Sequence, residues 1–544
     1  MKHLFVIIAA FVVMSCNVNG QEGLDFKSLK KKYSWTVPDE SFKTDTVVIK
    51  GKIENFNTET SPFKTLQCSL YDEFEKQTAS AVVINSDGSF EKKIKISYPV
   101  CNKLYAHTDE GFLFIPFFAY PGDTVEISAK IVGGKIECSY PSGRSKQFAR
   151  FLNYTAVSLQ YQCVEKARNY KDGFDKFQNF AENFWNEFST KIYNDGLKLS
   201  FSDEEMSMAL SFAQGYFAYT VLTALMYMRE ECYEMKPKGQ NMYMTLKDTA
   251  LYQKMKDPEN YAFLTHTDFS DKNLFFMADL FTLLNRISYS LMPYSEKYDF
   301  FSCFSPDNQV ENNIKFFHRA DSLLRTALHT EDNSLVAQMV MYQHISSLIE
   351  MAWNDMTNDS IKEIRDKILP LFSFEPIKTK AAQIIEHRLN DTEIAVPIKK
   401  CAATAFIDSL RNVYKGKYLY LDFWSMGCAP CRMTIETSKD LRKEIANNPD
   451  IKLVFVNGDN PQNAAMREYV ATHLVGEVKV VPGEDVFTEL RDVFNFSGIP
   501  HFEVITPDGK VVKERYITFG LLNSFDYRNF KLEFDKLKEK LEKN

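Results

Sequence analysis

A strand-like segment that leads directly into two closely spaced cysteines constrains this chain more than any other feature. The segment Tyr418–Trp424 is apolar and aromatic, and Cys428 and Cys431 follow it in a Cys-Ala-Pro-Cys sequence. A helix-compatible segment, 432–445, comes next, so Cys428 is expected at or near the first turn of a helix. Unpaired backbone N–H groups and the positive end of the helix dipole favour a thiolate there. The second thiol is close enough to resolve a mixed disulfide, and the pattern therefore predicts a thiol–disulfide exchange site.

The residues from Leu421 to Cys431 resemble the active-site strand and helix start of the thioredoxin superfamily. A second strand-like run, Leu453–Asp459, and a Gly-Ile-Pro sequence before the strand His501–Ile505 extend the similarity. The segment between Cys431 and this proline is long, as in the TlpA/ResA-like branch of the superfamily, whose members are extracytoplasmic. The resemblance covers about residues 398–544 and implies an α/β thioredoxin-like fold with thiol:disulfide oxidoreductase activity.

The resemblance also implies roles for three residues that exchange electrons and protons. Cys428 corresponds to the attacking thiol, and Cys431 corresponds to the resolving, more buried thiol. Asp422 stands where thioredoxins keep a buried carboxylate. Because desolvation raises the pKa of a carboxyl group in an apolar setting, Asp422 could exchange the proton of Cys431.

Three further residues correspond to the substrate side of the site. Trp424 matches a tryptophan that packs beneath the cysteines, and Pro500 matches a cis-proline. Ile499, which precedes this proline, is the residue whose backbone pairs with the substrate in that family. Gly427 and His501 depart from the residues usual in thioredoxins, and these departures concern substrate choice and redox potential rather than the chemistry.

Each of these residues also has a simpler interpretation. A Cys-x-x-Cys pair could be half of a zinc site, but the sequence has no second such pair and no His-x3–5-His spacing. Asp422 could be an ordinary acid at the end of a strand, and Pro500 could be a turn proline. No pattern for a metal, haem or other cofactor is present, so none is expected.

The beginning of the chain predicts export. An apolar run, Leu4–Met14, follows a lysine and is too short to span a bilayer as a mature helix. Residues 1–20 therefore read as a bacterial signal peptide, in which the sequence before Cys16 resembles a lipobox and Cys16 would become lipidated. The alternative is ordinary cleavage after Gly20, which leaves Gln21 first and no anchor.

The region 43–140 predicts an antiparallel β-sandwich. Short, partly alternating apolar runs are separated by turn residues such as those of Asn85–Gly88. The region resembles the N-terminal β-sandwich of exported Bacteroidetes proteins with thioredoxin domains. The strands expected are Thr46–Glu54, Leu66–Tyr71, Ser80–Ile84, Phe90–Ile96, Phe112–Tyr120 and Thr124–Ala129.

The region 141–390 predicts an all-α domain, because glycine and proline are scarce and apolar residues recur every three or four positions. Ser202–Glu205 has the pattern of a capping box and begins a helix through the uncharged run Met206–Met228. That run could cross a bilayer, but its hydroxyl and amide side chains favour a buried core helix. A linker, 390–397, is expected before the thioredoxin-like domain at 398–544.

Composition narrows the possible functions. The net charge of −7 gives no basic surface, so no nucleic-acid partner is expected. Ten cysteines in 544 residues are too few for a disulfide-built scaffold, and most of those outside the pair are expected to be buried apolar residues.

Together these patterns predict a multidomain, exported thiol:disulfide oxidoreductase that reduces protein disulfides. Its partners would be protein thiols and disulfides and a membrane electron donor, and it would lie on the periplasmic side of the cell envelope. Two alternatives stay open: a non-catalytic envelope lipoprotein that uses the thioredoxin fold to bind a partner, and a thiol peroxidase. The peroxidase class usually carries an isolated peroxidatic cysteine without a close resolving partner.

Overall fold

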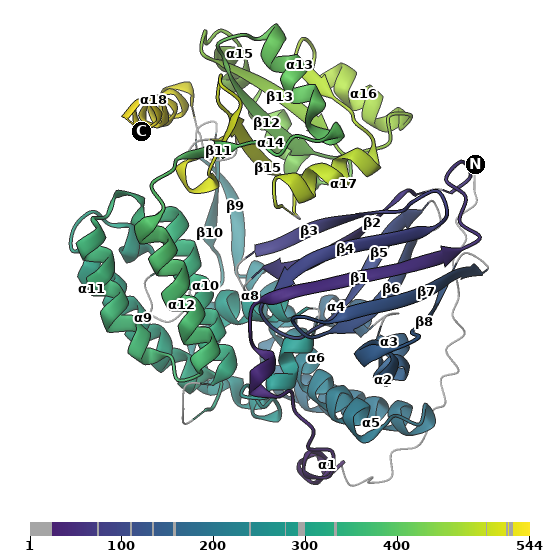
Figure 1. Ribbon diagram of the computed structural model, residues 1–544. Helices are drawn as coiled ribbons and strands as arrows, with labels where there is room; N and C mark the ends of the chain where they lie inside the picture. The colour runs from purple at the N-terminus through teal and green to yellow at the C-terminus, as the bar shows by residue number, and fades with distance from the viewer. Residues whose placement is uncertain are drawn as a thin grey trace.

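The computed structural model describes residues 24–543, except 62, 73–75, 109–110, 133–134, 156–158, 239–240, 278, 292–299, 331–333, 497, 518–519 and 522–525. The predicted signal peptide and Cys16 lie outside the described residues. The chain forms a β-rich N-terminal part, a helical middle and a C-terminal α/β part (Figure 1).

Two four-stranded sheets form the predicted sandwich. Their strand orders are β4-β1-β7-β8 and β3-β2-β5-β6, and every neighbouring pair is antiparallel except β1 and β7. In β1 the alternating residues Val47, Ile49 and Ile53 are buried, as expected for a strand with one face on the core. The strands are β1 Asp45–Glu54, β2 Thr65–Asp72, β3 Lys76–Val83, β4 Ser89–Ile96, β5 Val100–Thr108, β6 Gly111–Ala119, β7 Thr124–Val132 and β8 Lys135–Ser139.

The middle of the chain is helical, as predicted, and also contains one unpredicted hairpin, β9 Tyr233–Lys238 with β10 Asn241–Leu246. A short helix, α1 Phe26–Lys32, precedes the sandwich. The middle helices are α2 Gly143–Gln147, α3 Ala149–Thr155, α4 Leu159–Arg168, α5 Phe177–Lys198, α6 Asp203–Glu230, α7 Thr249–Lys256, α8 Leu280–Leu291, α9 Gln309–Ala327, α10 Leu335–Met351, α11 Asn358–Ile368 and α12 Glu375–Asn390.

The uncharged run in the middle of the chain forms the core helix α6. Ser202 and Glu205 make the expected capping box at its start. In the described part of the chain, α6 alone is long and apolar enough to cross a membrane, and its apolar window is completely buried in protein.

The sandwich and the middle helices share one continuous hydrophobic core. Buried side chains of a single cluster run from Val37 to Leu389. Phe118 of β6 illustrates the continuity, because its ring lies 4.4 Å from that of Phe148 and 4.6 Å from that of Phe276. The change from strands to helices near residue 140 is therefore not a boundary between two cores.

The C-terminal part is built on a six-stranded sheet of order β11-β16-β15-β12-β13-β14. β12, β13 and β14 are parallel, whereas β15 is antiparallel to β12. Helices cover both faces and create two separate cores (Figure 1). The elements are β11 Ala395–Pro397, α13 Ala405–Val413, β12 Tyr418–Trp424, α14 Ala429–Thr437, α15 Lys439–Ala446, β13 Ile451–Asn457, α16 Ala464–His473, β14 Val478–Val480, α17 Glu484–Val493, β15 His501–Ile505, β16 Lys510–Val512 and α18 Tyr527–Lys543.

The predicted linker is an ordered junction. Asp391 is ion-paired with Lys513 and Arg515, and β11 joins the edge of the six-stranded sheet through β16. On another side, α17 packs against β3 of the sandwich, and Lys92 is ion-paired with Asp492 at 3.0 Å (Figure 1). The α/β part is thus held against both of the preceding parts.

Candidate active site at the Cys428–Cys431 disulfide

The two cysteines lie where the central strand of the sheet gives way to a helix. β12 has β13 on one side and β15 on the other, and it ends at Trp424. Cys428 is the N-cap residue of α14, and its sulfur accepts the backbone N–H of Cys431 at 3.2 Å. The two sulfur atoms are 1.99 Å apart and form a disulfide. The sulfur of Cys428 therefore lies at the positive end of a helix.

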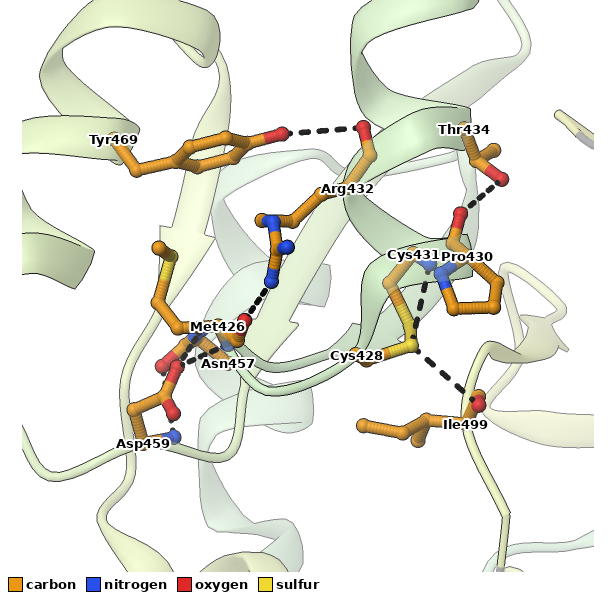
Figure 2. Close-up of a disulfide and its surroundings, with 10 residues drawn as sticks. All are labelled: Met426, Cys428, Pro430, Cys431, Arg432, Thr434, Asn457, Asp459, Tyr469 and Ile499. Atoms are coloured by element: carbon orange, nitrogen blue, oxygen red, sulfur yellow. Dashed lines mark hydrogen bonds between the residues drawn. A yellow bond between two sulfur atoms is a disulfide. The ribbon is translucent and has the colours of Figure 1, made fainter. Parts of the chain in front are cut away.

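The loop before Cys428 is held by charged side chains on both sides (Figure 2). Asp459, just beyond β13, accepts the backbone N–H of Met426 at 2.8 Å and the side-chain N–H of Asn457 at 2.9 Å. Arg432 turns back from α14 and donates to the carbonyl oxygen of Met426. Both backbone groups of Met426 are thus engaged, and the start of α14 is fastened to the end of β13.

Tyr469 connects α16 to the same helix. Its hydroxyl donates to the carbonyl oxygen of Arg432 at 3.1 Å and to the carboxylate of Glu436 at 3.0 Å. Its ring lies 5.5 Å from that of Trp424, which is completely buried at the end of β12 in the same hydrophobic cluster as both cysteines. Trp424 therefore forms part of the apolar base of the site.

The two cysteine residues differ in exposure. Cys428 is 8% exposed and Cys431 is 2% exposed. The Cys428 sulfur also lies 3.5 Å from the carbonyl oxygen of Ile499, and the peptide bond between Ile499 and Pro500 is cis (Figure 2). A partner that approaches the disulfide would thus meet Cys428 first, beside the backbone of Ile499.

Asp422 lies on β12, on the face of the sheet that carries the cysteines. Tyr420 and Trp424, two positions away on either side, share its face and belong to the cluster around the disulfide, whereas Leu421 and Phe423 belong to the opposite core. Asp422 is buried, and desolvation raises the pKa of its carboxyl to about 7, against an opposing attraction from Arg442. Near neutral pH this carboxyl can therefore both accept and donate a proton.

His501, which follows the cis-proline, faces away from the disulfide. Its Nε2 lies 2.8 Å from the Oε1 of Glu503, and its ring stacks on Phe496 with centroids 4.1 Å apart. Phe502, between the two polar residues, packs on the disulfide side of the sheet. The pair formed by His501 and Glu503 supports the strand after the proline and does not touch the sulfur atoms.

Sequence reasoning did not identify Asp459, Arg432, Tyr469 and Arg442 as parts of the site. Arg432 directly follows Cys431, which is a local signal, but only the fold shows that its side chain turns back to the loop. The other three lie on or beside later elements, and their positions depend on how β13, α15 and α16 pack.

The other cysteines of the described chain lie outside this disulfide. Five of them are buried and two, Cys138 and Cys401, are partly exposed. Burial raises the pKa of Cys68, Cys138 and Cys163 to about 12, so these thiols stay protonated. Among the described residues, no group of three or more His, Cys, Asp or Glu side chains is arranged to hold a metal ion.

Comparison with known proteins places this region in a family. Residues 416–511 match the thioredoxin-like family model. A search of curated proteins found no match. With the sheet order and the cysteine geometry, the family match identifies the C-terminal part of the chain as a thioredoxin-like domain with the fold and Cys-x-x-Cys pair of the thiol:disulfide oxidoreductase class.

Three solved structures show the same kind of similarity. The thioredoxin domain of a thiol-disulfide oxidoreductase from Bacteroides vulgatus is 21% identical over 23% of this chain and 82% of that chain, with a TM-score of 0.18. A thiol:disulfide interchange protein from Bacteroides sp. is 22% identical over 19% of this chain and 65% of that chain, with a TM-score of 0.17. A thioredoxin-like protein from Bacteroides caccae is 10% identical over 46% of this chain and 92% of that chain, with a TM-score of 0.22. All three TM-scores are below 0.5, so the assignment of the domain rests on the family match and on the geometry of the site.

Proposed function

We propose that this chain is an exported thiol:disulfide oxidoreductase that reduces protein disulfides through Cys428 and Cys431. The observation that carries the proposal is the position of the Cys428 sulfur. It caps the start of α14, accepts a backbone N–H there, and belongs to the more exposed cysteine of the pair. A thiolate at this position is stabilised by the helix dipole and is open to attack a partner disulfide.

The first step forms a mixed disulfide. In the reduced pair, the Cys428 thiolate attacks one sulfur of the client disulfide, and the other client sulfur leaves as a thiolate. The carbonyl oxygen of Ile499, 3.5 Å from the Cys428 sulfur, would accept an N–H of the client backbone as the client lies across the cis-proline. Trp424 supports the two cysteines from below.

The second step releases the client. The Asp422 carboxylate takes the proton of the Cys431 thiol, and the resulting thiolate attacks the Cys428 sulfur. The mixed disulfide breaks, the Cys428–Cys431 bond forms, and the client leaves with both of its sulfurs reduced. Two electrons pass from the cysteine pair to the client, so a dithiol donor at the membrane must restore the reduced pair.

We infer the direction and the location from the sequence. The resemblance to the TlpA/ResA-like branch and the assistance that Asp422 gives to the reduced Cys431 both favour reduction over oxidation. The apolar run Leu4–Met14 supports export, and the lipobox-like sequence before Cys16 supports a lipid anchor on the periplasmic side of the envelope. Equilibration with glutathione buffers tests the direction: a potential near that of strong oxidants, about −120 mV, would contradict a reductase.

Trapping of clients tests the function. The Cys431→Ser chain, expressed in cells, should accumulate mixed disulfides through Cys428, because the release step is blocked. These adducts should appear in the envelope fraction, and Cys16→Ser should release the protein from the membrane. A second chain with Cys428→Ser should trap nothing. Replacement of the partly exposed Cys401 by Ser in the trapping variant is the matched control and should leave the adducts unchanged.

The alternative classes predict different results. A binding module would show no adducts, while its partner stayed bound without the cysteines. A thiol peroxidase would consume peroxide rapidly in the reduced form, and the Cys431→Ser variant would accumulate a sulfenic acid rather than protein adducts.

A further inference from the structure

A buried arginine lies beneath the helix that carries the two cysteines. Arg442 belongs to α15, and its side chain is 3% exposed. Its Nη2 donates to the carbonyl oxygens of Ile435, in α14, and of His473, at the end of α16, both at 3.1 Å. Its Nη1 donates to the carboxylate of Glu477 at 2.9 Å. A buried guanidinium is costly unless it is paired, and these contacts fix its position in the core.

One donor of this guanidinium is not used by the fold. The Nε–H of Arg442 is buried and has no hydrogen-bond partner among the described residues. Glu477, the carboxylate paired with Arg442, is also largely buried. The guanidinium of Arg442 therefore lies in the layer between α14 and the sheet, close to the negative charge of Glu477 and with one of its donors unused.

The same layer contains Asp422. In the register of the sheet, Asp422 on β12 is the partner of Phe455 on β13. Phe455 belongs to the cluster around the disulfide, so its ring and the carboxyl of Asp422 lie on the same face. The guanidinium carbon of Arg442 is 5.5 Å from the centre of the Phe455 ring. The arginine is thus one aromatic ring away from the buried acid.

Electrostatics agrees with this geometry. Burial raises the pKa of Asp422 to about 7, and Arg442 acts in the opposite direction. A charge in a water-poor layer acts over a longer distance than a charge in solvent. Other titratable groups on this side of the sheet include Tyr418 and Tyr420 on β12, Cys428 and Cys431 at the start of α14, Tyr469 and His473 on α16, Tyr516, Tyr527 on α18, and Glu477 behind the arginine.

We propose that Arg442, ion-paired with Glu477, is a positioning residue that keeps a fraction of the Asp422 carboxyl ionised and ready to take the proton of Cys431. The proton moves from the Cys431 thiol to the Asp422 carboxylate as the Cys431 sulfur attacks Cys428. This inference rests on the proposed function. It adds that the opposite charges of Arg442 and Glu477 move the protonation midpoint of Asp422 in opposite directions.

The test uses the full chain and two readouts. Infrared difference titration against Asp422→Asn gives the protonation midpoint of the carboxyl, and the pH dependence of client release from the Cys428 mixed disulfide gives the kinetic midpoint. Arg442→Met should raise both midpoints by about one pH unit and slow release at neutral pH severalfold. Glu477→Gln should lower both midpoints, because it leaves the guanidinium unneutralised. Arg442→Lys keeps the charge and should stay near the unmodified protein.

The outcomes separate this inference from the proposed function. If the midpoints stay in place in the Arg442 and Glu477 variants while the cysteines still cycle, the role of Arg442 is wrong and the function stands. Equal shifts of one sign in both variants would also overturn the role. If Arg442→Met does not fold, Glu477→Gln decides by the direction of its shift. If the cysteine pair never cycles, the function is wrong, and the infrared midpoint still reports on Arg442 and Asp422.

Discussion

Asp422 is an acidic residue within an otherwise apolar strand of the C-terminal sheet. Its neighbours Leu421 and Phe423 fill the opposite core, and its own face meets the cluster around the cysteines. Burial raises the pKa of its carboxyl to about 7 from the ordinary value of 3.8. The folded protein therefore binds a proton at Asp422 between about pH 4 and pH 7, where the unfolded chain does not.

This difference predicts a pH-dependent effect of Asp422→Asn. Because the pKa is raised on folding, the acid lowers stability progressively as pH rises from about 4 to 7, by about 4 kcal/mol in total. The asparagine variant lacks this loss, so its stability relative to the unmodified protein should increase over that range and level off above it. Urea unfolding of the oxidised proteins from pH 4 to pH 9 measures the difference.

The matched control is Asp440→Asn on α15, whose side chain is exposed. Its stability difference from the unmodified protein should stay nearly constant with pH. A constant difference for Asp422→Asn as well would show that the buried carboxyl keeps an ordinary pKa.

Among single residues, the sequence predicts those site residues that lie close together along the chain. Cys428, Cys431, Asp422 and Trp424 lie within one strand and one helix start, so a local motif and its resemblance to thioredoxins are enough to predict where they lie. Arg442 could not be predicted in this way, because it lies in a charged helix and its burial depends on the carbonyl groups and the carboxylate at the end of α16.

Among the elements, the start of α6 shows how one side chain can serve two helices. Glu205 accepts the backbone N–H of Ser202 at 3.0 Å, which completes the capping box. Its other oxygen accepts the N–H groups of Arg150, at 3.0 Å, and of Phe151, at 3.1 Å, at the start of α3. The sequence predicts the first contact from a three-residue spacing, whereas the other two contacts join residues more than fifty positions apart.

Glu205→Ala should therefore destabilise the sandwich and the helical middle, which share one core, by about 3 kcal/mol or more, since three buried or half-buried N–H groups lose their acceptor. Asp203→Ala removes an exposed acid from the same first turn and should change stability by less than about 1 kcal/mol. Thermal unfolding of the two variants makes the comparison. Equal effects would mean that water replaces the carboxylate at α3.

The strands that sequence patterns miss have weak patterns for physical reasons. β8 is an edge strand of its sheet, and β9 and β10 form an isolated pair, so none of these three strands needs a continuous apolar face. In β5 the buried residues include the adjacent pair Val100 and Cys101, which breaks the alternation of a simple strand.

In the whole molecule, the thioredoxin-like domain is held against the rest of the chain by ordered contacts and is not joined to it by a flexible linker. Asp391, expected in a linker, is ion-paired with Arg515 at 3.1 Å and with Lys513; Asp391 and Arg515 are largely buried and Lys513 is partly buried. Asn354 from the helical part donates to the carbonyl oxygen of Arg515 at 2.6 Å. The composition of residues 390–397 predicts a connection, but the partners that order it are more than a hundred positions away.

Asp391→Asn should loosen this junction, because it leaves two partly buried cations without their carboxylate, at a cost of roughly 3 kcal/mol. Limited proteolysis should then cut faster within residues 390–398. Asp355→Asn is a control at another ion pair between the helical and α/β parts, since its pair with Lys540 is exposed and is worth less than about 1 kcal/mol. Equal cleavage of the two variants would contradict the structural role of Asp391.

The continuity of the first core decides where this protein can be divided. A fragment that ends after β8 would leave Phe118 without the rings of Phe148 and Phe276 that cover it. Because such a fragment would expose an aromatic hydrophobic surface, we expect it to aggregate rather than fold. A cut just before Ile394 instead leaves the redox sheet with the helices that cover both of its faces. The hydrophobic cores of the described chain are thus divided between the sandwich with its helices and the α/β part, and the ion pairs of Asp391 with Lys513 and Arg515 hold the two together.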